Sequence, residues 1–430
     1  MSAESQSTGV LHRLVSARPG EMPALVAAFL YNFLLFTAYY ILRPLRDSMG
    51  VAGGVENLDD LFGWTLVGML VAVPVYGWIS GRFRRAVFLP WIYAFFVVQL
   101  LGFWLVFRLL ADDAPTARVF FVWVSVFNLF VVSVFWSFMA DLFDREQAKR
   151  VFAFIAAGAS TGGILGASIP AFFAETLGDV NLLLVSSALL AGTILPIRYL
   201  LRWSSARVPS GERLDERPIG GNPFAGFKRV FTSGYLSGIA LFVFLMAAVS
   251  TFLYLQQAEL LQVHFPERAE RTAFLGRIEL AVNIGVVLMQ MFAVGRLTTR
   301  FGLPVMIVSV PLFVMAGFLL IAASPTLATL VGVYIFRRLG QYAIVRPCRE
   351  MLYTTVDRES KYKAKNVNDT LVYRTSDFVV AKGHDAFVAT FAASLTWVAW
   401  LGAGIAALWA VVAYLLGRAH ERTVAGKSPG

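Results

Sequence analysis

Charged residues and cysteine are both scarce in this chain of 430 residues. Asp, Glu, Lys and Arg make up 15% of it, whereas soluble domains carry roughly 25%. This scarcity, with 58% hydrophobic residues and a mean hydropathy of +0.67, excludes an ordinary soluble protein and predicts one embedded in a lipid bilayer. The single cysteine, Cys348, excludes an internal disulfide framework and a cysteine-based zinc site.

The sequence motifs of common catalytic and cofactor sites are missing as well. No GxxxxGK[ST] phosphate loop occurs, because the AGKS stretch at 425–428 has Glu421 where the upstream glycine would stand. HExxH and GxSxG are also missing, and no histidine cluster suits a metal. We therefore expect no enzyme, no cofactor and no metal site. We expect no cleavable signal either, since residues 1–21 contain no apolar core.

Long apolar runs are abundant instead. About 20 residues of helix cross the hydrocarbon of a bilayer, and a helix satisfies its own backbone hydrogen bonds there. We predict twelve transmembrane helices, near 23–47, 58–80, 86–108, 117–143, 151–174, 180–201, 235–262, 273–294, 303–323, 326–346, 366–392 and 395–417.

The distribution of Lys and Arg predicts the orientation of these helices. With the N-terminus in the cytoplasm, the cytoplasmic segments hold 26 of the 37 basic residues. The opposite side holds only four, Arg108, Arg118, Arg268 and Arg271. We therefore expect both termini to be cytoplasmic. The basic residues lie in short loops and form no compact domain, so we expect no nucleic-acid partner.

Two short motifs recur at nearly the same distance along the chain. GWISGRFRR ends the second predicted helix and FAVGRLTTR the eighth, with Gly81 and Gly295 214 positions apart. The sequence DRE occurs at Asp144 and again at Asp357, 213 positions later. This common offset predicts a duplicated six-helix unit.

The predicted architecture is an all-α integral membrane protein with two pseudo-symmetric six-helix bundles. A long polar linker between parallel halves is typical of the major-facilitator fold, which holds its substrate near the midplane. The GRFRR loop also resembles the loop after helix 2 in that superfamily. The predicted parts are a cytoplasmic tail (1–22), a first bundle (23–201), a linker (202–233), a second bundle (234–418) and a second tail (419–430).

Three glycines on the fifth predicted helix indicate close helix packing. Gly158, Gly162 and Gly166 recur every four residues, which makes a small-residue face on which another helix can approach closely.

Seven basic residues remain inside the predicted spans, where each costs about 2.5–3.5 kcal/mol near the helix centre. They are Arg43, Arg46, Arg277, Arg337, Arg338, Arg374 and Lys382. Arg277 lies close to a helix end and can extend its charge to the interface. The others we expect to line a cavity or to pair with acidic residues.

The first predicted helix carries three of these charges on one face. Arg43, Arg46 and Asp47 stand at positions i, i+3 and i+4, and Asn32 and Tyr39 lie further along the same side. We predict that all five bind substrate. The alternative is that Arg43 and Asp47 neutralise each other and only stabilise packing.

The eleventh predicted helix is the most polar. Its residues Arg374, Asp377, Lys382, His384 and Asp385 fall within an arc of roughly 160°. We predict a substrate contact for Arg374 and a coupling or ion-pair role for Asp377 and Lys382. The alternative is a ladder of salt bridges whose outer end, with His384 and Asp385, reaches solvent.

Charges on three other helices complete the predicted site. Arg337 and Arg338 lie too deep in the tenth helix to reach the interface easily, and we predict that they bind substrate. Glu279 and Glu259, on the eighth and seventh helices, are predicted ion-pair or coupling partners. The guanidinium fork binds phosphate or carboxylate in bidentate fashion, so clustered arginines favour an anionic substrate.

Several stretches resemble the ATP/ADP translocase family of plastids and intracellular bacteria, which exchanges nucleoside phosphates across membranes. They are YYILRPLRDSM on the first helix, SVFWSFMADLFDREQAKRVFAFIAAGASTGGILG at 133–166, and KYKAKNVNDTLVYR at 361–374. The resemblance implies exchange of a nucleotide-like anion, with Arg43, Arg46 and Asp47 among the binding residues. The sequence departs from the family at 124–128, which lacks an expected acid, and at Asp377, where a lysine is expected.

Three functions remain open. The first is a secondary transporter that moves an organic, phosphorylated anion by alternating access and exchange. The second is a proton-coupled carrier of a neutral, zwitterionic or drug-like solute, with Glu279, Asp377 or His384 as the protonatable group. The third is a sensor or scaffold that transports nothing. We expect a monomer in a bacterial inner membrane.

Overall fold

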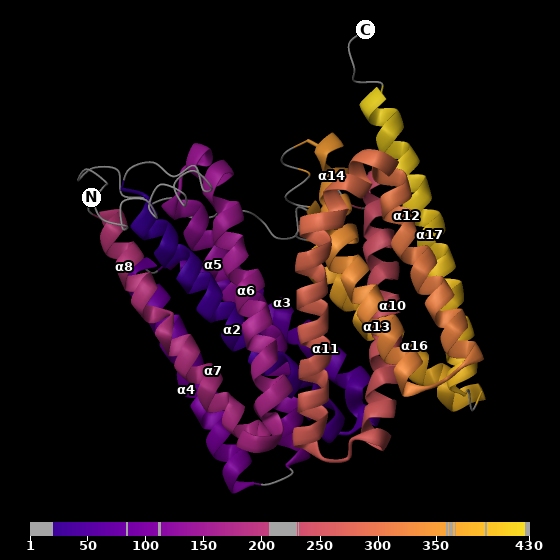
Figure 1. The fold of residues 1–430 in the computed structure, drawn as a ribbon, viewed down its shortest axis with the longest axis horizontal. Coiled ribbons are helices and arrows are strands. Elements are labelled where there is room, and N and C mark those ends of the chain that lie inside the picture. Colours follow the sequence, from indigo (N-terminus) through magenta and orange to yellow (C-terminus); the bar gives the residue numbers. More distant parts are fainter. Residues whose placement is uncertain are drawn as a thin grey trace. The chain divides into compact units, whose positions relative to one another are not determined.

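The computed structural model describes residues 20–82, 85–110, 113–205, 230, 232–357, 360, 364–365, 367–391 and 394–425. The described chain is helical almost throughout, and helices occupy all twelve predicted spans (Figure 1). Several predicted features lie at least partly outside the described residues: both tails, most of the linker, Phe83 and Arg84 of GRFRR, and the start of the KYKAKN segment.

The described residues of the first half of the chain contain seven α-helices. They are α2 (Met22–Ala52), α3 (Leu58–Arg82), α4 (Arg85–Leu109), α5 (Ala114–Leu142), α6 (Arg145–Leu177), α7 (Leu182–Gly192) and α8 (Ile194–Ser205). The sixth predicted span is thus two consecutive helices that meet at Thr193. Helix α2 continues to Ala52, so Asp47 lies inside the helix and not at its end.

The second half begins with α10 (Gly234–His264) and α11 (Arg268–Met289). A π-helical turn, η3 (Gln290–Val294), joins α11 to α12 (Gly295–Ala323). The segment GRLTTR, 295–300, lies between the eighth and ninth predicted spans and is helical in the structure. The backbone turns at Gly302, where φ is 72°, a conformation that glycine adopts without strain.

The tenth and eleventh spans also contain π-helical turns. The tenth comprises α13 (Leu327–Gly340), η4 (Gln341–Val345) and α14 (Arg346–Leu352), followed by the short turn η5 (Tyr353–Thr355). The eleventh comprises η6 (Val367–Val372) and α16 (Tyr373–Phe391), and α17 (Leu395–Ala425) is the last helix.

Nine helical segments of the described chain are long and apolar enough to cross a membrane. One of them joins α11 and α12 across η3. Helices α13 and α16 fall outside this set: α13 is short, with 14 residues, and α16 carries several charges. Both helices hold residues of the predicted site.

The contacts divide the chain into two compact units, which exchange short segments between the sequence halves. Unit 1 comprises 1–53, 71–219 and 267–283, and unit 2 comprises 54–70, 220–266 and 284–430. The start of α3 therefore packs within unit 2, and the start of α11 packs within unit 1. The bundle boundaries predicted from the sequence, 23–201 and 234–418, stay predictions.

In unit 1, α2 and α6 approach closely along the predicted glycine face. A Cβ added at Gly158 would lie 2.6 Å from the Phe29 carbonyl oxygen, and one at Gly166 would lie 2.5 Å from that of Thr37. Gly162 meets the backbone of Phe33 in the same way. The small-residue face predicted from the sequence is thus a helix–helix contact.

In unit 2, α10 packs against α16, and α12 against α17 (Figure 1). The Ser376 hydroxyl donates to the Phe244 carbonyl oxygen at 2.7 Å, which ties α16 to α10. Gly402 of α17 lies against the ring of Phe318 on α12.

The repeated DRE motif has the same local role in both halves. Asp144 accepts a hydrogen bond from the backbone N–H of Gln147 at 2.8 Å, and Asp357 accepts one from that of Ser360 at 2.9 Å. In each case the aspartate satisfies a backbone donor three residues later, as helix-capping residues do. The two aspartates of the repeat therefore make equivalent local hydrogen bonds.

Candidate functional site

Charged residues of the predicted site lie in both units. In unit 1, the Arg46 guanidinium donates to Asp47 Oδ1, with 2.9 Å from Nε and 2.5 Å from Nη2. It also donates to the Ser125 hydroxyl of α5 at 3.3 Å and lies 5.0 Å from the centre of the Phe121 ring. Arg46 therefore has a fixed position between α2 and α5.

Arg43 of α2 is joined to Glu279 of α11. Its Nε lies 3.2 Å from Glu279 Oε1, and its guanidinium lies 5.9 Å from the centre of the Tyr40 ring. The Arg43 side chain is 16% exposed and the Glu279 side chain 4%. The acid is therefore the more deeply buried partner, and the cation reaches the accessible side.

Three more polar contacts hold the start of α11 to other parts of unit 1. The Ser48 hydroxyl accepts a hydrogen bond from Arg271 Nε at 3.1 Å and donates one to the Arg268 carbonyl oxygen at 3.2 Å. Arg268 pairs with Asp179, with 2.5 Å between Nε and Oδ2. Sequence reasoning treated Arg268 and Arg271 as loop residues and missed these contacts, although their spacing of three residues places them on one face of a helix.

Asn32 and Tyr39 are buried at packing contacts of α2. Asn32 is fully buried and donates through Nδ2 to the Ile155 carbonyl oxygen of α6 at 2.8 Å. Tyr39 is 8% exposed and contacts the rings of Phe36 and Tyr40. Substrate binding by Asn32 and Tyr39 stays a prediction.

In unit 2, Arg374 and Asp377 form an ion pair on α16. Arg374 Nη1 lies 3.0 Å from Asp377 Oδ2, and Asp377 Oδ1 accepts from the Thr251 hydroxyl of α10 at 2.9 Å. The Arg374 side chain is 22% exposed and that of Asp377 is 7% exposed. As in the Arg43–Glu279 pair, the side chain of the acid is more deeply buried than that of the arginine.

Arg337 and Arg338 of α13 are both buried, at 4% and 1% exposure. Arg337 donates through Nη1 to Gln341 Oε1 at 2.5 Å. Both guanidinium groups lie 5.5 Å from the centre of the Tyr334 ring, and Arg338 also lies 5.5 Å from that of Tyr342. Aromatic faces thus stabilise both cations.

Lys382 contacts two aspartates at the start of α3. Its Nζ lies 2.5 Å from Asp59 Oδ2 and 2.7 Å from Asp60 Oδ1, and its side chain is 46% exposed. His384, which like Lys382 belongs to α16, is buried, and its Nδ1 lies 3.2 Å from Asp385 Oδ1. Glu259 of α10 is exposed. A coupling or ion-pair role for Lys382 and Glu259 stays a prediction.

Another polar network lies at the end of α14. Arg349 Nη2 lies 2.9 Å from Asp369 Oδ1, and Asn368 Nδ2 donates to the Tyr353 hydroxyl at 2.9 Å. Burial raises the pKa of Tyr353 to about 12, so this phenol stays neutral near pH 7. Sequence reasoning did not single out Tyr353 or Asn368, since neither carries a charge.

In the described part of the chain, no three His, Cys, Asp or Glu side chains are arranged to hold a metal ion. The arginines Arg43, Arg46 and Arg374 each combine a carboxylate contact with a partly exposed side chain. A guanidinium has five N–H donors, more than one carboxylate uses.

Comparison with known proteins decides the family. The sequence profile of the Major Facilitator Superfamily matches residues 22–348, about three quarters of the chain. The chain belongs to the major facilitator superfamily. This superfamily fits the helices and the membrane character described above, so the protein is an integral membrane protein.

Solved structures of transporters share the fold. One is a POT family transporter in complex with 5-aminolevulinic acid, with a TM-score of 0.66, 11% identity and coverage of 92% of this chain and 96% of that chain. Another is the nucleoside transporter NupG, with a TM-score of 0.63, 13% identity and coverage of 91% and 98%. At these identities the likeness concerns the fold alone.

A sequence relative carries the resemblance noted above. ADP,ATP carrier protein 2, chloroplastic, of Arabidopsis thaliana is 24% identical over 286 residues, which are 59% of this chain and 46% of that protein. The major-facilitator chain thus spans about half the length of this curated relative.

Proposed function

We propose that this major-facilitator protein exchanges an organic, phosphorylated anion, nucleotide-like in character, by alternating access. The observation that carries the proposal is the shared arrangement of Arg43–Glu279 and Arg374–Asp377. In both pairs the arginine is more exposed than its acid. An anion that approaches from the accessible side would meet a guanidinium first.

Binding would then replace one set of ion pairs by another. In the empty carrier, Glu279 and Asp377 neutralise Arg43 and Arg374. A bound phosphate would compete for the same guanidinium donors, because arginine binds phosphate in bidentate fashion. Occupancy would therefore change the contact that joins α2 to α11 and the ion pair within α16. A ligand shifts a conformational equilibrium only through such differences in contact.

The other predicted residues have assigned parts in this proposal. Arg46, Asp47, Asn32 and Tyr39 would complete the binding surface of unit 1, with Arg337 and Arg338 contributing in unit 2. Lys382 and Glu259 would pair with neighbouring charges. The weak similarity to the chloroplast ADP,ATP carrier supports a nucleotide as the first anion to test.

Transport by the purified protein in liposomes tests the proposal. Liposomes loaded with ADP should take up labelled ATP, and empty liposomes should not. Arg43→Ala and Arg374→Ala should each lower uptake at least tenfold, whereas Arg277→Ala should leave uptake unchanged, because Arg277 lies in an exposed pair with Glu175. Equal uptake by wild type and both arginine variants would reject the assigned site.

The proton-coupled alternative has support from the buried acids. Glu279 and Asp377 are 3% and 5% exposed, and protonation of either would release its arginine. This alternative predicts uptake driven by a pH gradient into liposomes that contain no counter-substrate. Exchange predicts no uptake under those conditions.

We also propose a bacterial inner-membrane location, with both termini in the cytoplasm, and a monomeric protein. The concentration of Lys and Arg in one set of loops supports this orientation. The single native cysteine makes the test simple. After Cys348→Ser, a cysteine introduced into either tail should react with an impermeant maleimide only once the cells are opened.

A further inference from the structure

Two pairs of exposed arginines lie where the Gly302 turn of α12 meets the last turns of α17. The four residues of this basic cluster are Arg296 and Arg300, just before the turn, and Arg418 and Arg422, near the end of α17. The two helices touch at this place, because a Cβ added at Gly417 would lie 2.8 Å from Pro304 Cα. Both pairs belong to unit 2, and the contact brings them to the same edge of it.

The positive charge of the basic cluster is not neutralised within the described chain. Each pair has a spacing of four residues, which places like charges on one face of a helix, where they repel each other. Among the residues that the structure describes, none of the four arginines forms an ion pair, and Glu421, three residues after Arg418, does not pair with it. An anion from outside the described chain would relieve this repulsion.

Aromatic and apolar side chains border the basic cluster. The Arg300 guanidinium lies 5.5 Å from the centre of the Phe301 ring, and that of Arg418 lies 6.0 Å from the centre of the Tyr414 ring. The two rings belong to residues that are 47% and 51% exposed. Exposed apolar residues continue along both helices away from the cluster; they are Val305, Leu312, Phe313, Val411 and Leu415. Cations and aromatic rings at the end of an apolar strip are typical of the headgroup level of a bilayer.

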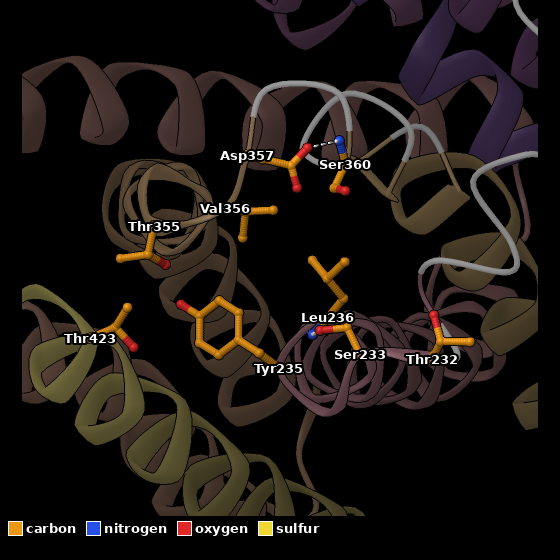
Figure 2. A pocket seen from close by; sticks show the side chains of 9 residues that line it. All are labelled: Thr232, Ser233, Tyr235, Leu236, Thr355, Val356, Asp357, Ser360 and Thr423. Carbon is orange, nitrogen blue, oxygen red and sulfur yellow. Dashed lines mark hydrogen bonds between the residues drawn. The ribbon is translucent and has the colours of Figure 1, made fainter. Parts of the chain in front are cut away.

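Figure 2 shows the inner side of the same turns of α17. Thr423 faces Tyr235 and Thr355 across a cavity inside unit 2. At roughly 100° per residue, Arg422 and Arg418 lie about 100° and 140° away from Thr423 around the helix. The two arginines are exposed and therefore belong to the outer surface of unit 2.

We propose that the basic cluster binds the phosphate of an anionic phospholipid, whose acyl chains lie along the apolar strip of α12 and α17. Guanidinium groups bind phosphate in bidentate fashion, and basic sites between transmembrane helices are typical places for anionic headgroups. The general surplus of basic residues in one set of loops explains a positive charge here. It does not explain two pairs on touching helix ends, each with an aromatic neighbour.

The proposed lipid site is separate from the proposed transport site, because it contains none of the arginines assigned to substrate. A bound headgroup would join the Gly302 turn to the end of α17 and so stabilise unit 2. The proposal therefore concerns stability, and it can fail while the proposed transport function stands.

Thermal unfolding of the full-length, detergent-purified protein tests this proposal. Phosphatidylglycerol is added in one arm and phosphatidylcholine in another, because both carry a phosphate but choline neutralises it. A third arm receives glycerol 3-phosphate, which has the phosphate without acyl chains. A ligand that binds the folded state raises Tm, and we expect phosphatidylglycerol to raise it by about 2 °C more than either other addition.

Variants assign the stabilisation to the basic cluster. Arg300→Gln with Arg418→Gln removes one charge from each pair and should at least halve the rise. Arg296→Gln with Arg422→Gln removes the other two charges and serves if the first variant fails to fold. The matched control is Arg198→Gln with Arg202→Gln, an exposed pair of the same spacing near the end of α8 in unit 1. This control should keep the full rise.

A rise with phosphatidylglycerol that the cluster variants lose and the control keeps supports the proposal. An equal rise with phosphatidylcholine would overturn it, because the charge of the headgroup would then not matter. An equal rise with glycerol 3-phosphate would also overturn it, since the occupant would be a free phosphate and not a lipid. No rise in the wild type, or an equal loss in the control and the cluster variants, would exclude a specific site at this place.

Discussion

Arg43 and Glu279 are joined by a 3.2 Å ion pair, although they come from opposite halves of the sequence. The pair lies inside unit 1, because the first part of α11 packs with α2 and α6. It is thus both a structural link of this unit and, in the proposed function, a switchable contact.

The first prediction concerns the stability that this pair provides. Glu279 is 3% exposed, so Arg43→Ala should lower the free energy of unfolding by roughly 3–5 kcal/mol, the usual cost of breaking a buried pair. The double variant Arg43→Met with Glu279→Met should recover much of this loss, since no charge stays buried. Thermal unfolding in detergent measures both effects.

The matched control is the Arg277–Glu175 pair in the same unit. Its side chains are 55% and 49% exposed, and exposed pairs contribute about 0–1 kcal/mol. Arg277→Ala should therefore change Tm very little. Similar losses for the two arginines would show that burial does not set the strength of the Arg43 pair.

The second prediction concerns the contact between α2 and α6. Gly162→Ala should destabilise the protein by roughly 1–3 kcal/mol, because the new Cβ would collide with the backbone of Phe33. Gly102→Ala in α4 should be neutral or stabilising by up to about 1 kcal/mol, since no atom lies within 4 Å of the added Cβ. Equal Tm values for the two variants would contradict close helix contact.

The third prediction concerns Asp377 in unit 2. Asp377→Asn keeps an oxygen for the Thr251 hydroxyl but removes the charge that neutralises Arg374. If substrate competes with Asp377 for Arg374, the variant should bind the anion about tenfold more tightly, a change of roughly 1.4 kcal/mol, and should exchange it more slowly. Binding to detergent-purified protein and exchange in liposomes measure the two effects. Unchanged affinity would remove Asp377 from the proposed switch.

The fourth prediction concerns the Tyr353 phenol. Its folded-state pKa, about 12, lies above the ordinary value of 10.0. The neutral form is therefore favoured by folding, and its stabilising contribution is complete below pH 10 and lost as the pH rises toward 12. Tm of the wild type should fall more steeply over that range than Tm of Tyr353→Phe. Parallel curves for the two proteins would show that Tyr353 does not titrate in this way.

The sequence allowed good prediction of the helices, because hydropathy and helix length are local properties. All twelve predicted spans are helical, and the glycine face of α6 is a helix contact. The prediction from sequence failed at positions where the regular helix is interrupted. The turn at Gly302, the join at Thr193 and the three π-helical turns depend on how neighbouring helices pack, which no apolar pattern records.

Ion-pair partners were predicted less well. On the sequence alone, Arg43 and Asp47 were natural partners, four residues apart on one helix. In the structure Asp47 accepts from its neighbour Arg46, while Arg43 reaches Glu279 on a distant helix. The amino-acid sequence is enough to show which charges must be satisfied inside a membrane, because burial of a charge is costly wherever it occurs. The acid that meets each arginine follows from the fold, because it depends on contacts between helices that are far apart in the chain.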